Sequence, residues 1–171
     1  MFYPMLEPLA SPLHLVLVSP QIPPNTGNVA RLCAVTGCRL ILVEPLGFSI
    51  DDRNLKRAGL DYWDKVFLKL YPTYDAYVAE YPQARRWLFS ARAETSLYAA
   101  RFEPGDHLVF GSEVTGLLPE VMEGGTGTPV TIPMLPERRS LNLSTSVGIG
   151  AYEALRQVQL GTAARQAPPS N

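Results

Sequence analysis

The stretch that decides the fold is LVLVSPQIPPNTGN, residues 15–28, in which a short apolar run leads into a proline-rich loop. Its first four residues are typical of a strand buried on both faces of a parallel sheet. Beyond the loop, Asn28 to Thr36 has a helical pattern that Gly37 closes, and Asn25 or Thr26 offers a side chain to cap the helix. The stretch therefore predicts a strand, a loop and a helix in succession.

Similar runs recur along the chain. Further strands are predicted at Leu40–Val43, Trp87–Phe89, Leu108–Phe110 and Val130–Ile132. Further helices are predicted at Asp52–Ala58, closed by Gly59, and at Thr73–Glu80, with Thr73 as the N-cap. This alternation of strands and helices predicts an α/β fold, a parallel sheet flanked by helices.

The longest helix is predicted to open at Asn142 and to run to about Leu160. Its apolar residues recur every three or four positions and form one stripe: Leu143, Val147, Ala151, Leu155 and Val158. We expect residues 1–12 to be a mobile N-terminal extension, residues 13–160 a single domain and residues 161–171 a disordered tail.

Composition narrows the class of protein. A chain of 171 residues that is 46% hydrophobic and 18% charged fits one globular domain. Its net charge of -1 means that any nucleic-acid binding depends on a local basic patch. Neither a signal peptide nor an apolar stretch of membrane-spanning length is evident, so we expect a cytoplasmic protein without membrane contact.

The sulfur and imidazole side chains are expected to be structural. Cys33 and Cys38 are too few for a disulfide framework and do not have a zinc-binding spacing, so we expect buried free thiols. His14 and His107 adjoin apolar strand residues, and we expect both to be buried.

The loop after the first strand lacks the glycine patterns that bind dinucleotides or nucleoside triphosphates. Arg31 follows within the next helix, near an N-terminus where the helix dipole does not favour a cation. The sequence leaves two alternative roles for Arg31: it forms a surface ion pair, or it belongs to an anion-binding site.

Two later segments carry residues suited to a ligand. In Leu108–Leu117 a strand ends at Gly111, where a ligand could approach the backbone, and Glu113 follows, which either positions a donor or belongs to a solvated turn. Near the start of the last helix, Ser140, Asn142, Ser144 and Ser146 are either caps or ligand contacts.

Together these segments resemble the SPOUT methyltransferase superfamily, and most closely its small subgroup of tRNA wobble-nucleotide ribose methyltransferases. The resemblance extends from Leu13 to Gln157. It rests on four motifs in a fixed order: IPPNTGN at 22–28, EPLGF at 44–48, GLDY at 59–62 and SLNLS at 140–144.

The resemblance implies a SPOUT fold with a C-terminal deep trefoil knot, a homodimer, and S-adenosyl-L-methionine as cofactor, released as S-adenosyl-L-homocysteine. No metal is expected. The residues implied to bind the cofactor are Ala91, Gly111, Ile132, Ser140 and Leu141. The residues implied to be catalytic are Arg31, Asn142 and Glu113. Relative to familiar members of the family, Ala91, Arg92 and Ser112 are departures.

The implied reaction is methyl transfer to the ribose 2'-hydroxyl of the wobble cytidine or uridine in the tRNA anticodon loop. Because a guanidinium has a pKa above ~12, Arg31 is expected to hold a phosphate and stabilise charge on oxygen rather than act as a base. The residues expected to contact RNA are Arg53, Lys56, Arg57, Arg138 and Arg139. Two alternatives remain: a non-catalytic RNA-binding protein with the knotted fold, and a methyltransferase acting on ribosomal RNA.

Overall fold

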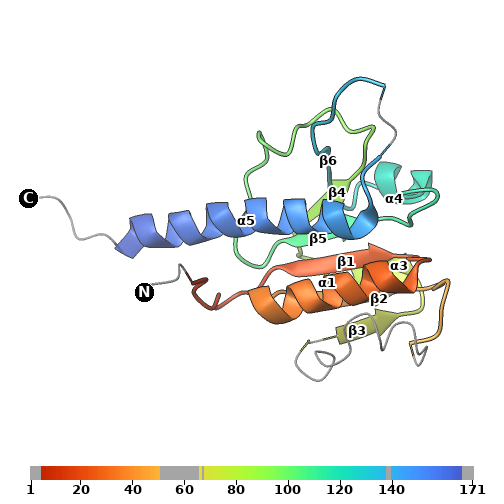
Figure 1. The fold of residues 1–171 in the computed structure, drawn as a ribbon, viewed down its shortest axis with the longest axis horizontal. Helices are drawn as coiled ribbons and strands as arrows, with labels where there is room; N and C mark the ends of the chain where they lie inside the picture. Colours follow the sequence, from red (N-terminus) through yellow and green to blue (C-terminus); the bar gives the residue numbers. More distant parts are fainter. Residues whose placement is uncertain (1–4, 51–65, 67, 138–139, 167–171) are drawn as a thin grey trace, which may run out of the picture.

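The computed structural model describes residues 5–50, 66, 68–137 and 140–166 (Figure 1). The elements found in these ranges are, in chain order, β1 (His14–Val18), α1 (Pro23–Thr36), β2 (Arg39–Val43), β3 (Leu68–Tyr71), α3 (Tyr74–Glu80), β4 (Arg86–Phe89), β5 (His107–Phe110), α4 (Pro119–Glu123), β6 (Thr128–Val130) and α5 (Leu143–Gln166).

The strands form one sheet in the order β3-β2-β1-β5-β4-β6, and all neighbouring strands are parallel. Leu15 of β1 lies opposite Leu40 of β2 on one side and Leu108 of β5 on the other. The chain runs outward from β1 through β2 to β3 and then crosses to β4 in the other half of the sheet. It next adds β5 between β4 and β1, and finally β6 on the outer side of β4. This confirms the predicted parallel α/β sheet and places the reversal of strand order between β1 and β5.

Helices cover both faces of the sheet. Figure 1 shows α1 and α5 running side by side. Leu15 and Leu17 of β1 pack in the same apolar cluster as Val29 of α1 and Val147 of α5. The alternate residues of β1 face the opposite cluster, which contains Tyr77 of α3 and Val121 of α4. The period of two in a strand therefore separates the two halves of the core.

Two strands differ from the sequence-based prediction. β6 ends at Val130 rather than at Ile132, while Thr131 makes only an isolated bridge to Ser96. β3 was not predicted, because it lies at the sheet edge and its residues, LKLY, are partly exposed and not continuously apolar. Edge strands lack the two-sided burial that produces an unbroken apolar run.

Helix α1 begins at Pro23, five residues earlier than predicted. Neither Asn25 nor Thr26 caps it, because both lie inside the helix and are buried, so that expectation is wrong. Proline suits the first turn, whose amides need no partner within the helix. The other end is as predicted: Gly37 is left-handed, with φ of 73°, and donates its N–H to the Cys33 carbonyl.

Helix α3 confirms Thr73 as an N-cap, since its Oγ1 accepts the Ala76 amide at 3.1 Å. Helix α4 was not predicted, because its five residues are too few to show a helical period. The predicted helix Asp52–Ala58 and its closing Gly59 lie outside the described residues. The trefoil knot stays a prediction from the family resemblance.

Helix α5 buries the predicted stripe, since Leu143, Val147, Ala151, Leu155 and Val158 are all in the core. It continues to Gln166, six residues beyond the predicted end, because Gly161 lowers helix propensity without ending the helix. The Gln159 side-chain amide also contacts the chain near its start. It donates to the Glu7 carbonyl at 2.8 Å and accepts the Glu7 N–H at 3.4 Å.

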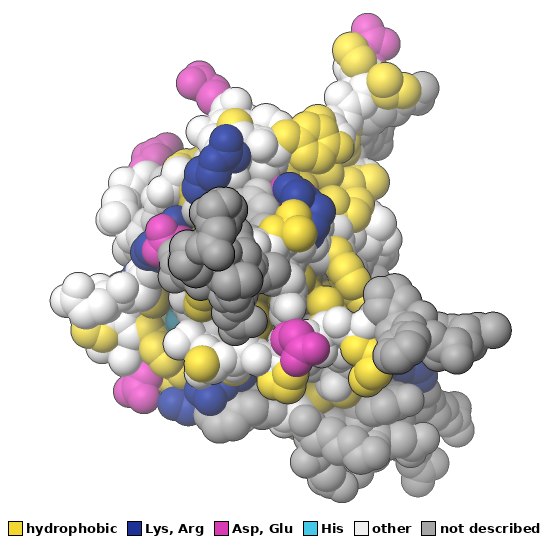
Figure 2. Space-filling view, turned by 90° about the vertical axis from the view of Figure 1, so that its left-hand side faces the viewer, with side chains coloured by type: hydrophobic (Ala, Val, Ile, Leu, Met, Phe, Trp, Pro, Cys, Tyr) yellow, Lys and Arg dark blue, Asp and Glu magenta, His cyan; other side chains and the backbone are white. Residues whose placement is uncertain are grey.

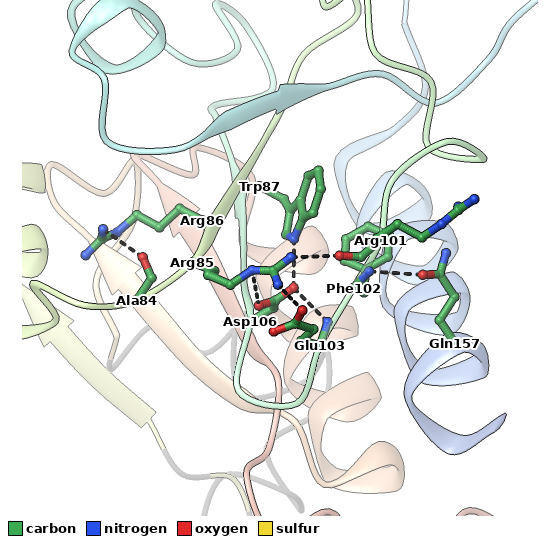
Figure 3. Close-up of polar contacts among 9 residues, drawn as sticks. All are labelled: Ala84, Arg85, Arg86, Trp87, Arg101, Phe102, Glu103, Asp106 and Gln157. Carbon is green, nitrogen blue, oxygen red and sulfur yellow. Dashed lines mark hydrogen bonds and ion pairs between the residues drawn. The ribbon is translucent and has the colours of Figure 1, made fainter. Parts of the chain in front are cut away.

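A polar network lies where β4 and β5 begin (Figure 3). Asp106 is nearly fully buried and accepts from Trp87 Nε1 at 2.8 Å and from the Glu103 N–H at 2.9 Å. Arg85 forms ion pairs with Asp106 and with Glu103. Seen from this end of the molecule, the basic and acidic side chains of the described residues are intermixed (Figure 2).

Both histidines and both cysteines are buried, which confirms their expected structural place. His14 and His107 stack with ring centroids 4.1 Å apart, and His107 Nδ1 shares a 2.7 Å hydrogen bond with the Tyr77 hydroxyl. Burial lowers the pKa of His14 to about 4 and that of His107 to about 3. Burial also raises the pKa of both thiols. Among the described helices, none has the length and apolar character needed to cross a membrane.

Candidate active site at the carboxyl edge of the sheet

A cavity of about 510 Å³ opens beyond the carboxyl ends of β4, β5 and β6. The segments that follow these strands form most of its wall, and the first turn of α5 closes one side. Parallel α/β sheets bind ligands at this edge, next to the point where the strand order reverses. The volume suits a ligand of cofactor size.

All five residues predicted to bind the cofactor line this cavity: Ala91, Gly111, Ile132, Ser140 and Leu141. They come from four segments that are far apart in the sequence. The fold therefore brings the predicted set together around one space. Their binding to the cofactor remains a proposal.

Gly111 is needed for a reason other than the predicted one. A Cβ atom built there would lie 1.9 Å from the Gly116 carbonyl carbon and 2.1 Å from the Leu117 nitrogen. The space beside Gly111 thus belongs to the chain's own turn, which the Ser112 and Gly116 backbones close with hydrogen bonds of 2.9 and 3.2 Å. Glycine is therefore required at position 111 by the turn that forms the cavity wall, and not only by the space that a ligand needs.

Aromatic side chains form an apolar part of the cavity wall. Phe89 and Phe110 stack with ring centroids 4.3 Å apart, and both line the cavity. Helix α5 crosses close to this pair because Gly150 has no side chain: a Cβ there would lie 2.8 Å from Phe89 Cζ. Small residues such as Ala91 and Ser140 leave the backbone open on other sides. This combination fits a ligand with a flat heteroaromatic ring and a polar chain, as S-adenosylmethionine has.

Glu113 projects from the turn after β5 to the beginning of α1. Its Oε2 accepts the Gln21 N–H at 2.7 Å, and its Oε1 accepts the Ile22 N–H at 3.0 Å. The Asn25 side-chain amide also donates to Oε1, at 3.0 Å. A carboxylate is favourable at a helix N-terminus because the unpaired amides and the dipole are positive there. Glu113 is therefore not a solvated turn residue, and its carboxylate oxygens already accept hydrogen bonds from within the protein.

Asn142 occupies the start of α5 and faces the same region. Its Oδ1 accepts the Thr145 N–H at 3.2 Å and the Ser144 hydroxyl at 2.7 Å, so Asn142 caps α5. Its Nδ2 donates to the Asn25 Oδ1 at 3.0 Å. A chain of hydrogen bonds thus runs from Glu113 through Asn25 to Asn142. It joins the starts of the first and last helices beside the cavity.

The loop after β2 packs against the loop after β1. The Gly47 N–H donates to the Pro20 carbonyl at 3.0 Å, and a Cβ at position 47 would lie 2.7 Å from Gln21 Cα. Gly47 of the EPLGF motif therefore contacts Pro20 and Gln21, the two residues directly before the IPPNTGN motif. Only glycine allows this approach of the two backbones.

Arg31 lies on α1, more than two turns from its start, rather than the one turn that was expected. Its side chain is exposed, and it is not among the residues that line the cavity. Of the three predicted catalytic residues, Glu113 and Asn142 are linked through Asn25, whereas Arg31 stands apart on the outer side of the same helix.

The predicted RNA-contacting residues lie outside the described part of the chain: Arg53, Lys56, Arg57, Arg138 and Arg139. A different cation, Arg92, lines the cavity and is exposed. Within the described residues, no cluster of three or more His, Cys, Asp or Glu side chains could hold a metal ion.

Proteins of known sequence and structure resemble this chain over most of its length. The tRNA (cytidine(34)-2'-O)-methyltransferase of Burkholderia pseudomallei is 48% identical over 147 residues, which are 84% of this chain and 94% of the relative. A solved structure described as giving insights into the 2-OH methylation of C/U34 on tRNA is similar with a TM-score of 0.82 and 50% identity. The match covers 86% of this chain and 96% of the other.

The fold is shared more widely than the sequence. The AdoMet-bound rRNA methyltransferase of Sinorhizobium meliloti has a TM-score of 0.77 at 18% identity, covering 88% of this chain and 58% of the other. The parallel sheet and the cavity at its carboxyl edge thus identify the chain as an α/β protein of the methyltransferase class. Within that class, the chain belongs to the SpoU rRNA Methylase family, which matches residues 12–152.

Sequence reasoning missed two parts of the site. Asn25 was considered only as a helix cap, although a buried asparagine needs partners for both ends of its amide. Ser146 was left as either a cap or a ligand contact and was not among the residues predicted to bind the cofactor, yet it lines the cavity from the first turn of α5. A helical-wheel comparison of Leu143 and Ser146, three residues apart on one face, would have indicated this.

Proposed function

We propose that this protein transfers a methyl group from S-adenosylmethionine to the ribose 2'-hydroxyl of nucleotide 34, cytidine or uridine, in the tRNA anticodon loop. The observation that carries the proposal is the 48% identity to a relative named for this reaction, over nearly its whole length. The cavity at the carboxyl edge of the sheet supplies the space that the reaction requires.

The cofactor fits the cavity in shape and chemistry. We propose that five residues of the cavity wall hold the cofactor: Ala91, Gly111, Ile132, Ser140 and Leu141. When bound, S-adenosylmethionine supplies an activated methyl group. The protein's task is then to present the ribose oxygen in line with that methyl and to assist removal of its proton.

Glu113 and Asn142 act in this proposal as positioning residues. Glu113 already accepts hydrogen bonds from three groups at the start of α1, so it is poorly placed to take a proton from the substrate. Asn142 uses its oxygen to cap α5 and its amide to hold Asn25. Together they fix two helix starts beside the cavity, which keeps the substrate-facing surface rigid.

Arg31 is assigned to the RNA. A guanidinium group is a planar donor that can bind two phosphate oxygens, so in this proposal Arg31 holds a phosphate and stabilises negative charge developing on the ribose oxygen. Its exposure on α1, away from the cavity lining, supports a contact with a large substrate rather than with the cofactor.

We further propose that the enzyme is a cytoplasmic homodimer. The sequence left two candidates for the interface, the stripe Leu143, Val147, Ala151 and Leu155 or the neighbouring N-terminal helix, and the stripe is buried within the protomer. The opposite side of α5 exposes Ile149, Tyr152 and Leu160, and α1 exposes Val35, so these side chains are the candidates for a subunit contact.

The deciding experiment uses the purified protein with tritiated S-adenosylmethionine and either total tRNA or ribosomal RNA. We expect label in tRNA, and mass mapping should place it on the ribose of nucleotide 34. Label confined to ribosomal RNA would support the alternative substrate. Binding of tRNA without any transfer would support the non-catalytic alternative.

A further inference from the structure

Arg92 lies at the cavity, and among the described residues its side chain has no hydrogen-bond or ion-pair partner. It follows β4 in a turn closed by two hydrogen bonds of 3.2 Å, from the Arg92 N–H to the Ser90 Oγ and from the Ala93 N–H to the Ser90 carbonyl. The turn fixes the backbone of Arg92. Its side chain is exposed and forms part of the cavity lining.

The other cations with described side chains are engaged elsewhere. Lys69, Arg85 and Arg156 form ion pairs with carboxylates. Arg86 is buried and donates only to carbonyl oxygens, and Arg101 donates to the carbonyls of Ala99 and Ala100. Arg31 and Arg39 also have interactions. For Arg92, no carboxylate within the described part of the chain lies at ion-pair distance.

Two acidic residues line the cavity, Glu113 and Glu123, and within the described residues neither forms an ion pair with Arg92. The Glu113 carboxylate lines the cavity, but it accepts hydrogen bonds from Gln21, Ile22 and Asn25. An arginine at the mouth of a cavity, with its charge not neutralised, is suited to an incoming anion. Its planar guanidinium can bind two oxygens of a phosphate at once.

We propose that Arg92 binds a backbone phosphate of the RNA next to the ribose being methylated, and so helps to set the position of the substrate. This inference rests on the proposed function. A ribose whose 2'-hydroxyl enters the cavity carries phosphates on both sides, and at least one of them must lie at the mouth. The protein's net charge of -1 gives no general attraction to RNA, so a local cation at the mouth contributes directly to affinity.

The exposure of Arg92 favours RNA over the carboxylate of the cofactor's methionine part. A cation that held the cofactor would be covered by the cavity walls, whereas Arg92 faces solvent from which a large substrate arrives. The two ligands are distinguishable, because loss of a cofactor contact lowers cofactor affinity and loss of a phosphate contact does not.

The test compares Arg92→Ala and Arg92→Lys with Arg101→Ala. Arg101 lies on the same connection between β4 and β5, but near the edge where β5 begins and away from the cavity (Figure 3). For Arg92→Ala we expect a KM for tRNA raised about tenfold and a kcat within about threefold of wild type. The slope of log affinity against log salt should become shallower by about one phosphate contact. Arg92→Lys should recover part of the affinity, and Arg101→Ala should match wild type.

Cofactor affinity, measured by calorimetry, should be unchanged in all three variants. If Arg92→Ala weakens cofactor binding, Arg92 contacts the cofactor and the inference is overturned. It is also overturned if Arg92→Ala and Arg101→Ala have the same KM and salt dependence. Failure of the proposed function appears separately, as an absence of methyl transfer by the wild-type protein. Affinity of the same variants for tRNA then still tests the phosphate contact.

Discussion

The Asn142 side-chain amide donates a hydrogen bond of 3.0 Å to the side-chain carbonyl of Asn25, a residue 117 positions earlier in the sequence. Since Asn25 also donates to Glu113, one buried amide holds the turn after β5 and the starts of α1 and α5 together. This junction borders the cavity, because Glu113 lines it. The architecture thus couples the stability of the helix starts to the shape of the site.

Replacing Asn25 with alanine should break both links of this junction. We expect Asn25→Ala to lower the free energy of unfolding by about 1 to 3 kcal/mol, because two hydrogen bonds are lost and their partners are left without them. Methyl transfer should also fall at temperatures where the variant remains folded. Urea denaturation and single-turnover assays measure the two effects.

Asn28→Ala is the matched control, since Asn28 is an exposed asparagine on the same helix. It should leave both stability and turnover near wild type. Equal effects of the two substitutions would show that the junction has no special role.

A bulky residue at position 146 should block the cofactor. Ser146 lines the cavity from the first turn of α5, whereas its neighbour Thr145 is exposed and does not line it. We expect Ser146→Leu to weaken S-adenosylmethionine binding at least tenfold in calorimetry and Thr145→Leu to leave it unchanged. Gly111→Val is a poorer probe, because its Cβ would collide with the Gly116 and Leu117 backbone whether or not a ligand is present. Normal affinity in Ser146→Leu would move the cofactor to another part of the protein.

Arg31 is expected to act on RNA and on the reaction, and not on cofactor binding. Arg31→Ala should bind S-adenosylmethionine normally and lose ~100- to 1,000-fold in the rate of methyl transfer, the typical effect of removing one preorganised donor to a developing oxyanion. Arg31→Lys keeps the charge but loses the planar fork, so it should restore RNA binding more than turnover. Single-turnover rates at saturating tRNA test this, and a near-wild-type rate in Arg31→Ala would remove Arg31 from the mechanism.

Stability should fall as the pH drops below neutrality, because His14 and His107 are buried as neutral groups. Their pKa values are lowered to about 4 and about 3, below the ordinary histidine pKa of about 6.5, so the unfolded chain binds more protons over this interval. The stabilisation is complete above pH ~6.5 and is lost progressively as the pH falls toward the folded-state pKa values. Between pH 7 and 5.5 we expect a loss of about 1 kcal/mol for each histidine.

The control for this pH dependence is His14→Phe. Phenylalanine keeps an aromatic ring against His107 and removes one titrating group. Its unfolding free energy should therefore depend about half as strongly on pH over the same interval. An unchanged dependence would mean that His14 does not contribute.

Local sequence patterns were sufficient for most of the secondary structure. The strand cores at β1, β2, β4 and β5 are continuous apolar runs because each is covered on both faces, and Thr73 and Gly37 mark helix ends through local backbone chemistry. The edge strand β3 and the short helix α4 lack such signals, since one is half exposed and the other has too few residues. The start of α1 was placed too late because its two opening prolines look like a loop.

The sequence by itself determined the order of the elements other than β3 and α4, the buried stripe of α5 and, through its motifs, the predicted residues that line the cavity. Only the tertiary structure showed which of these residues hydrogen-bond to one another and therefore which position the site. Only the folded sheet brings Glu113 to the start of α1 and Asn142 to Asn25, because these hydrogen bonds join residues about 90 to 120 positions apart. The same is true of Arg92. The proposed role of Arg92 depends on the absence of a carboxylate partner among the described residues. A local sequence pattern cannot predict this, because ion pairs form between residues that only the folded chain brings together.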